Sequence, residues 1–305
     1  MSEEVILDGG FRVATGLLPN QESDNLLCAN LEDFPDDWIW DGEDIQRHMV
    51  LGGTDRYKLD RARRAFRMRN QGGLGKCNAS SNASGMEQVR EQQGFKHVEL
   101  NDCFTYMQVN GGADQGSTLP STFDNLQKVG VAPYRLQVGG MTKTFPNDVF
   151  KRSQVNAELY NQAQIEASRF KGVRFLKLPL GDFRKFCQAS ATCIARGLPI
   201  VWAWHVGNNG SRLNNGYMQC SNGPGNHSNL IHSGKWVGGS QLVHPDNQNS
   251  WGPTKDTIYG PSGPSWGEGG FGLATMEDLY SCVQYHPPYT MVSAGIDPTD
   301  PIFDV

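Results

Sequence analysis

The spacing of hydrophobic and polar positions changes near residue 135, with helical spacing before that point and strand-like runs after it. Three segments in the first part are predicted to be helices, at residues 77–93, 101–107 and 119–128. Asn101 is a favourable N-cap for the second helix, and Gly130 is a favourable stop for the third. The first helix is dominated by small and polar side chains, so we expect it to pack closely against its neighbours.

The second part of the chain begins with alternating strand and helix patterns. Strands are predicted at residues 173–178 and 198–204, with a helix at residues 182–196 between them. Residues 207–229 are rich in glycine, asparagine and serine, which predicts a loop. Strand-like pieces continue to about residue 273, so the whole pattern indicates an α+β protein with a helical half followed by a strand-rich half.

Length and composition exclude several classes of protein. The chain has 305 residues, 38% of them hydrophobic, and a mean hydropathy of −0.50. That length suffices for one large domain or for two lobes that share a cleft. No apolar run approaches the roughly 20 residues of a membrane span, and the first residues lack the pattern of a signal peptide. We therefore expect no membrane partner, and a location in the cytoplasm or within a virus particle.

The seven cysteines are spread along the chain and include no CxxC pair. This spacing fits neither a zinc ribbon nor a thioredoxin-like site. Without a signal peptide, most of these thiols are expected to be reduced and partly buried. We predict no metal and no organic cofactor.

Charge is distributed unevenly near the N-terminus. Residues 1–46 hold twelve acidic residues and one basic residue, whereas residues 47–76 hold nine basic residues and two acidic ones. Residues 1–50, the acidic extension, cannot form a core alone, so its aromatic residues are expected to bury on the body or on a partner. The basic strip at residues 61–69 is better interpreted as a solvated segment facing this extension than as a nucleic-acid arm.

Four residue types with hydrolytic chemistry occur in the order Gln71, Cys77, His232 and Asn249. A thiolate is the reactive form of cysteine, and a helix N-terminus and a nearby imidazolium both favour it. Cys77 opens the first predicted helix. A histidine would act as its base, Asn249 would orient the ring, and Gln71 would donate to an oxyanion.

The choice among histidines depends on the spacing to Asn249. His232 lies 17 positions before Asn249, which is enough for a hairpin that returns Asn249 to its side. His227 falls in the predicted loop, and His244 opens a segment that is typical of a turn. The sequence therefore favours His232, with Trp251 shielding the bond between histidine and asparagine from water.

Over roughly residues 65–285 the sequence resembles the papain-like cysteine peptidases. No single motif is specific, but several occur in the order that the family has. The motifs are Gln71-Gly72 with Gly75-x-Cys77, Leu100-Asn101-Asp102, Gly116-Ser117, His232 with Val237-Gly238, Asn249-Ser250-Trp251-Gly252, and Trp266-Gly267-Glu268-x-Gly270-Phe271.

This resemblance implies a two-lobe α+β fold with the active-site cleft between a helical left lobe and an antiparallel, β-rich right lobe. The expected division is residues 51–135 for the helical lobe carrying the nucleophile, 136–290 for the lobe carrying His and Asn, and 291–305 for a tail. The resemblance also implies cleavage of a peptide or protein substrate through an acyl-thioester on Cys77. Residues expected to bind substrate are Gly116, Ser117, Ile231 and Trp251.

The sequence departs from the family pattern beside the nucleophile. Leu74 stands where the family has a disulfide cysteine, Asn78 replaces an aromatic residue, and Lys76 is also unusual. No inhibitory prodomain is recognisable. These departures leave an alternative: a catalytically weak or inactive papain-fold component of a larger assembly, held through the N-terminal extension. An amidase or an acyl transfer to an amine on the same residues is a third reading.

Overall fold

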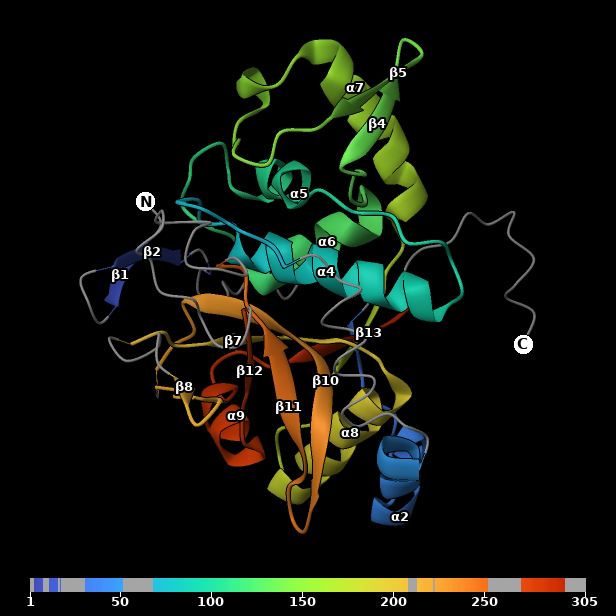
Figure 1. Cartoon of the computed structure of the whole chain (residues 1–305), viewed down its shortest axis with the longest axis vertical. Helices are drawn as coiled ribbons and strands as arrows, with labels where there is room; N and C mark the ends of the chain where they lie inside the picture. Colours follow the sequence, from blue (N-terminus) through green and yellow to red (C-terminus); the bar gives the residue numbers. More distant parts are fainter. Residues whose placement is uncertain are drawn as a thin grey trace.

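The computed structural model describes residues 3–7, 11–15, 17, 31–51, 68–207, 213–221, 223–251 and 270–293. In Figure 1 the helices of the first half lie above a large sheet, whose other helices lie below it. Within the described part of the chain, no helix has the length and apolar character needed to cross a membrane.

The upper half contains four α-helices and one strand pair. Its elements are α4 (Cys77–Gln92), α5 (Asp102–Val109), α6 (Leu119–Lys128), β4 (Arg135–Val138), β5 (Met141–Thr144), η3 (Arg152–Gln154), α7 (Ala157–Ala167) and η4 (Ser168–Phe170).

The lower half is built on a sheet of nine strands in the order β3-β6-β13-β7-β10-β11-β12-β9-β8. Its strands are β3 (Leu31–Asp33), β6 (Arg174–Lys177), β7 (Ile200–Trp204), β8 (Leu213–Asn214), β9 (Tyr217–Met218), β10 (His227–Gly238), β11 (Leu242–Gln248), β12 (Phe271–Leu273) and β13 (Tyr289–Ser293). Its helices are η1 (Asp36–Trp38), α2 (Gly42–Gln46), η2 (Arg47–Leu51), α8 (Phe183–Arg196) and α9 (Met276–Cys282). A separate hairpin joins β1 (Glu3–Leu7) and β2 (Phe11–Thr15).

Helix α4 lies between the two halves (Figure 1), and all of its residues from Cys77 to Val89 are buried. Its small side chains allow this position because they let the backbones of neighbouring elements approach. A Cβ atom at Gly85 would lie only 2.9 Å from the side chain of Met291 on β13. The prediction that this helix packs closely is confirmed.

The two faces of the sheet carry separate hydrophobic clusters. On β7, Trp202 and Trp204 belong to the cluster that includes α8, whereas Val201 and Ala203 belong to the cluster that includes α4. Successive side chains of a strand point to opposite faces, so a strand covered on both sides is hydrophobic throughout. This explains the uninterrupted apolar run that predicted the strand.

A third cluster joins β4 and α7 to α5. Leu136 and Val138 alternate inward along β4 and pack in the same cluster as Phe104 on α5 and Leu159 on α7. The helical half therefore continues to η4, and the predicted division at residue 135 is too early. Strand pair β4–β5 has the local pattern of the second half but packs with the first.

The predicted start of α5 and the predicted stop after α6 are both confirmed. Asn101 caps α5 by accepting from the backbone N–H of Phe104 at 3.0 Å. Gly130 follows α6 with a φ angle of +92°, and a Cβ atom there would lie 2.1 Å from the carbonyl oxygen of Ala167. Only glycine fits this approach, which brings the end of α6 against the end of α7.

One predicted loop and one predicted turn are strands instead. Residues 207–229 contain β8 and β9, and β10 begins at His227 within the same segment. His244 and the three residues after it lie in β11. The first residues of β10 are polar, but they are buried and pair with β7. Pairing across the sheet thus overrides local composition.

Part of the acidic extension is attached to the lower half. Strand β3 forms an edge of the large sheet by pairing in parallel with β6, and Phe34 is buried in the cluster beneath the sheet. The guanidinium of Arg196 on α8 lies over the rings of Trp38 and Trp40. The expectation that these aromatic residues bury on the body is confirmed.

Candidate active site

Cys77 is the first residue of α4, and its side chain is buried. Residues 70–76, the nucleophile turn, lead into it. Gly72 has a φ angle of +59° there, and its backbone N–H donates to Asn70 Oδ1 at 2.8 Å. A thiol at the N-terminus of a helix is close to unpaired backbone N–H groups, which favour the thiolate.

His227 is the histidine that Asn249 contacts. The two side chains are joined by a hydrogen bond of 2.8 Å between His227 Nε2 and Asn249 Oδ1. The amide oxygen can only accept, so Nε2 carries the hydrogen and Nδ1 carries the ring's lone pair. Among the described residues, Nδ1 is buried without a hydrogen-bond partner. This tautomer leaves Nδ1 able to take a proton.

Aromatic rings enclose His227. The ring of Trp251 lies over it with centroids 4.6 Å apart and an interplanar angle of 30°, and Trp204 meets it edge-on at 6.1 Å. Burial lowers the pKa of His227 to about 4, although hydrogen bonding with Asn249 and Asn229 works in the other direction. The sequence predicted that Trp251 would shield a bond between His232 and Asn249; its ring lies instead over His227, the histidine that Asn249 contacts.

The first turn of α4 lies beside the first residues of β10. The hydroxyl oxygen of Ser81 is 3.0 Å from the carbonyl oxygen of Cys77 and 2.9 Å from that of Ser228. Because Ser81 is one turn from Cys77 and Ser228 follows His227, the two candidate residues lie at the same end of the pair of elements.

His232 lies elsewhere, and the prediction that it pairs with Asn249 is wrong. Its Nε2 donates to Asp246 Oδ2 at 2.7 Å, and both side chains are completely buried. Its carbonyl oxygen accepts from Gln88 Nε2 at 2.8 Å. Gln88 lies eleven positions after Cys77, or about 16 Å along a helix that rises 1.5 Å per residue. The hairpin of β10 and β11 is longer than predicted.

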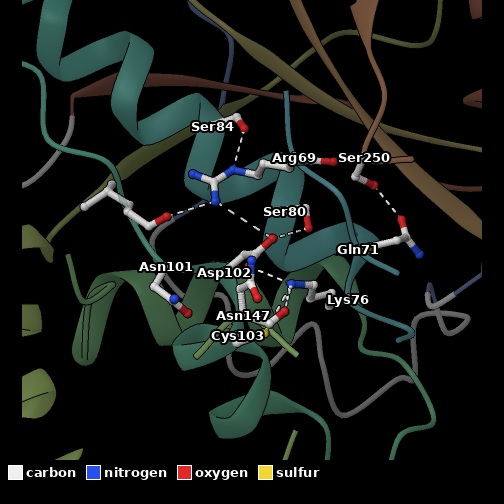
Figure 2. A network of polar contacts seen from close by, with 12 residues as sticks. Arg69, Gln71, Lys76, Ser80, Ser84, Asn101, Asp102, Cys103, Asn147 and Ser250 are labelled. Atoms are coloured by element: carbon white, nitrogen blue, oxygen red, sulfur yellow. Dashed lines mark hydrogen bonds and ion pairs between the residues drawn. The ribbon is translucent and has the colours of Figure 1, made fainter. Parts of the chain in front are cut away.

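Gln71 connects the nucleophile turn to the segment that carries Asn249 (Figure 2). Its Oε1 accepts from Ser250 Oγ at 2.5 Å, and its backbone N–H donates to Ser250 O at 2.7 Å. Its Nε2 donates to the carbonyl oxygen of Leu74 at 3.1 Å, within the turn itself. Gln71 thus joins the turn that leads to Cys77 to the segment that contains Asn249 and Trp251.

Asn78 ties α4 to residues 116–118, which contain the predicted substrate-binding residues Gly116 and Ser117. Its Nδ2 donates to Thr118 O at 2.7 Å and lies 3.3 Å from Ser117 Oγ. The residue that replaces the family's aromatic side chain is therefore a buried connection between the nucleophile helix and this segment.

Lys76 points into a buried polar network (Figure 2). Its Nζ donates to Asp102 Oδ1 at 3.0 Å and to Asn147 O at 2.7 Å, and it lies 3.2 Å from Cys103 Sγ. Burial opposes the charge of Lys76, but the carboxylate of Asp102 raises the pKa of Lys76 above its ordinary value. The side chain of Lys76, the residue before the nucleophile, is thus held in the interior by these partners.

Arg69 belongs to the same network (Figure 2). Its Nε donates to Ser84 Oγ at 2.7 Å, and its Nη1 donates to Leu100 O at 2.9 Å. It also pairs with Glu87 at 2.5 Å. The prediction of a solvated strip is therefore wrong for Arg69, while residues 61–67 of that strip lie outside the described residues.

Leu17 lies between the 116–118 segment and the residue that precedes His227. It forms a parallel bridge with Ser117, and its backbone N–H donates to Asn226 O at 3.2 Å. Its side chain, 5% exposed, belongs to the cluster that contains Cys77. A Cβ atom at Gly225 would lie 3.2 Å from Leu17 Cδ2.

The same Cβ atom, placed on Gly225, would lie 2.9 Å from both Ala203 Cβ and His286 Cδ2. The side chains of Leu17, Ala203 and His286 therefore all lie close to Gly225, and none of these four residues was predicted from the sequence. Ile231, predicted to bind substrate, instead packs in the cluster beneath the sheet with Trp202. Strand alternation along β10 places it there.

No group of three or more His, Cys, Asp or Glu side chains in the described ranges is arranged to hold a metal ion. The described cysteines, which exclude Cys28, are free thiols. The available side-chain chemistry is that of a thiol, a neutral imidazole and two amides.

Comparison with known proteins finds no matching family model and no matching curated protein. Solved structures do match. Xylellain, a cysteine protease from Xylella fastidiosa, has a TM-score of 0.56 at 16% identity, covering 97% of this chain and 99% of its own. ProCathepsin B S9 from Trypanosoma congolense has a TM-score of 0.57 at 12% identity, covering 97% and 94%.

The cysteine protease and lectin-like domains of Cwp84, a surface layer associated protein of Clostridium difficile, match with a TM-score of 0.55 at 14% identity. The match covers 94% of this chain and 57% of that one. The fold is thus that of the papain-like cysteine proteases, a divergent α+β version of two halves with α4 between them. The predicted fold class is confirmed.

Proposed function

We propose that this protein is a cysteine-type peptidase with Cys77 as the nucleophile and His227 as the base. One observation carries the proposal: His227 is held by Asn249, under Trp251, at the end of β10 that lies beside the first turn of α4. The fold, shared with cysteine proteases, makes peptides and proteins the substrate class to test.

In the proposed reaction, His227 Nδ1 takes the thiol proton of Cys77, and the thiolate attacks the carbonyl carbon of a peptide bond. The oxyanion accepts from the backbone N–H of Cys77 and from the side-chain amide of Gln71. A donor of this kind contributes roughly 10²–10³ in rate. The imidazolium of His227 then protonates the leaving amine, and a thioester remains on Cys77.

Water completes the cycle. His227 Nδ1 removes a proton from a water molecule, which attacks the thioester carbonyl, and Cys77 leaves as the thiolate. Throughout, Asn249 keeps the ring in one orientation and one tautomer, and Trp251 keeps water away from that hydrogen bond. No step requires a metal or an organic cofactor.

The segment at Leu17 supports a proposal about access. Its backbone contacts both Ser117 and Asn226, and its side chain packs in the cluster that contains Cys77. We propose that the N-terminal extension restricts entry of substrate until this segment moves. A branched aliphatic side chain in a substrate would then take the place of Leu17 beside Gly225 and Ala203.

The contacts of Lys76 and Asn78 favour the peptidase over an inactive structural component. Both departures from the family pattern have partners of their own in the interior, on Asp102 and on the 116–118 segment. Neither therefore supplies a reason for inactivity.

Alkylation tests the assignment of the nucleophile in the full-length protein. Cys220 is the most exposed of the described cysteines, so an unactivated protein would react there first with a substoichiometric thiol reagent at about pH 6. The proposal predicts that a peptide-based electrophile, added once limited proteolysis has released the N-terminal segment of the full-length protein, labels Cys77 instead, in wild type and in the Cys220→Ser variant.

Peptide mapping would locate the label, and cleavage of a leucine-containing peptide library would be measured with wild type and Cys77→Ala. Labelling at Cys220 alone, together with no cleavage after release of the N-terminal segment by limited proteolysis, would contradict the proposed function.

A further inference from the structure

The nucleophile turn is linked to the 116–118 segment through the carboxylate of Asp114. Asp114 Oδ1 accepts from the backbone N–H of Gly75 at 2.9 Å and from the hydroxyl of Tyr106 at 2.5 Å. The Tyr106 oxygen in turn accepts from the backbone N–H of Gly116 at 3.0 Å. One chain of hydrogen bonds therefore runs from the residue two before Cys77 to the start of the 116–118 segment.

In this chain of hydrogen bonds, every donor is matched with an acceptor. Each backbone N–H donates, the hydroxyl accepts from Gly116 and donates to Asp114, and the carboxylate accepts twice. Burial and the hydrogen bond to Asp114 raise the pKa of Tyr106, so its hydroxyl stays protonated and remains a donor. Hydrogen bonds to a charged acceptor are about twice as strong as those between neutral groups.

Tyr106 is a fixed point for these contacts. It lies on α5 and is completely buried, and the helix begins at its Asn101 cap. Asp114 is only partly buried, on the loop after α5. A helix in the interior thus holds a loop carboxylate, and the carboxylate holds the nucleophile turn.

No disulfide holds the nucleophile turn among the described residues, where every cysteine is a free thiol. Leu74 stands in the turn at the position at which the sequence resemblance places a disulfide cysteine. Asn78, on the other side of Cys77, also binds the 116–118 segment through Thr118 O. The residues on both sides of Cys77 are therefore fixed to one segment by polar side chains, independently of redox conditions.

We propose that Asp114 is a positioning residue for Cys77, which with Tyr106 holds the nucleophile turn and the 116–118 segment in register. This rests on the proposed function only in taking Cys77 as the nucleophile. Asp114 acts through Gly75 and Tyr106 and takes no part in the chemistry. Its loss would let the thiol move away from the helix N-terminus and from His227, and the thiolate would be less stabilised.

The test compares Asp114→Ala with Asp114→Asn in the full-length protein. Both variants remove the same charge, but the asparagine oxygen can still accept from Gly75 and Tyr106. Hydrogen exchange at the Gly75 and Gly116 amides should be at least about tenfold faster in Asp114→Ala than in wild type, because Gly75 loses its charged acceptor and Tyr106, which accepts from Gly116, loses the partner of its hydroxyl. In Asp114→Asn it should stay within about threefold of wild type, since only the charge is lost.

The second readout is the pH midpoint of Cys77 alkylation by iodoacetamide. It should be about one pH unit higher in Asp114→Ala than in Asp114→Asn, which corresponds to roughly a tenfold loss of thiolate. Asp124→Ala, which removes a carboxylate paired with Lys128 on α6, is the control and should leave the midpoint unchanged.

Equal midpoints in the alanine and asparagine variants would overturn the proposal, even with a lower melting temperature, because stability alone would then account for the residue. If Asp114→Ala does not fold, Tyr106→Phe decides: exchange should quicken at Gly116 and not at Gly75, and no change at Gly116 refutes the link. Neither readout needs turnover, so an inactive wild type would refute the proposed function while the positioning result still stands.

Discussion

Strand β10 carries two buried histidines, His227 at its first residue and His232 near its middle, and the partners of the two rings differ. His227 donates to the amide oxygen of Asn249, whereas His232 donates to the carboxylate of Asp246. Both rings leave Nδ1 without a hydrogen-bond partner in the described part of the chain. An amide orients a ring without adding charge, while a carboxylate forms an ion pair once the ring is protonated.

Position along α4 separates the two histidines as clearly as their partners do. Next to His227, the carbonyl of Ser228 lies beside Ser81, one turn from Cys77; the carbonyl of His232 lies beside Gln88, three turns from it. A ring near the thiol needs a fixed orientation and a nitrogen that can gain and lose a proton. A ring deep between the hairpin and α4 needs only a partner. The comparison therefore assigns chemistry to the start of the strand and stability to its middle.

The largest expected effect is on catalysis. His227→Ala removes the proposed base and should lower kcat/KM by at least about 10³. His232→Ala should lower it by less than about tenfold per folded molecule, because that ring lies too far from Cys77 to exchange its proton.

Cleavage of one peptide would be measured for both variants, with the folded fraction determined by near-ultraviolet circular dichroism. The reverse order of effects would show that the two histidines of β10 have been assigned the wrong way round.

The features that the sequence predicts correctly are those that depend on residues close to one another in the chain. Helix α4, the Asn101 cap and the stop at Gly130 follow from residues that lie within a few positions of one another. Cys77 and Asn249 were identified for the same reason, since each is part of a compact motif. Such signals do not depend on how the rest of the chain folds.

His227 escaped prediction because its role depends on the length of a hairpin. The register pairs Leu230 with Gln248 and continues to Gly238 and Leu242, so the return strand brings Asn249 past His232 to His227. A run of polar residues around His227 indicated a loop, although pairing with β7 buries it. The two histidines are distinguished only by the number of residue pairs between β10 and β11, which sets the histidine that Asn249 reaches. This number is a long-range property.

The second expected effect is on stability. Asp246→Ala leaves the buried Nε2–H of His232 without its acceptor and should lower the free energy of unfolding by about 1–3 kcal/mol. Urea denaturation followed by tryptophan fluorescence would measure it. Asp148→Ala, a change at an exposed carboxylate, is the matched control and should change stability by less than about 0.5 kcal/mol. Equal losses in the two variants would contradict the structural role of the pair.

A third effect appears in the pH dependence of stability. The pKa of His227 is lowered by burial from 6.5 to about 4, so the unfolded state binds this proton between those values and the folded state does not. Stability is therefore unaffected by His227 above pH 6.5 and falls as the pH drops toward 4, by at most about 3 kcal/mol.

The His227→Gln variant should lack this part of the acid destabilisation. His244 and His286, whose pKa values are also lowered by burial, remain in both proteins and cancel in the difference. Denaturation at about pH 7 and about pH 4.5 would measure it. Parallel pH profiles for wild type and His227→Gln would show that the ring is protonated in the folded protein.

The smallest expected effect comes from making the surroundings of His227 resemble those of His232. Asn249→Asp gives His227 the kind of partner that His232 has, and its oxygen can still accept from the backbone N–H of Ser250, now at 2.7 Å from Asn249 Oδ1. A carboxylate beside the ring favours the imidazolium, so the alkaline limb of the kcat/KM profile should move up by about 1–2 pH units. Activity at the optimum should fall less than about tenfold, because the ring keeps its orientation.

Asn249→Ala is the control: it should lose about tenfold at every pH, with no upward shift, since it removes the orienting contact and adds no charge. A profile for Asn249→Asp that merely falls, like that of Asn249→Ala, would mean that the partner of His227 sets its orientation and has no influence on its proton.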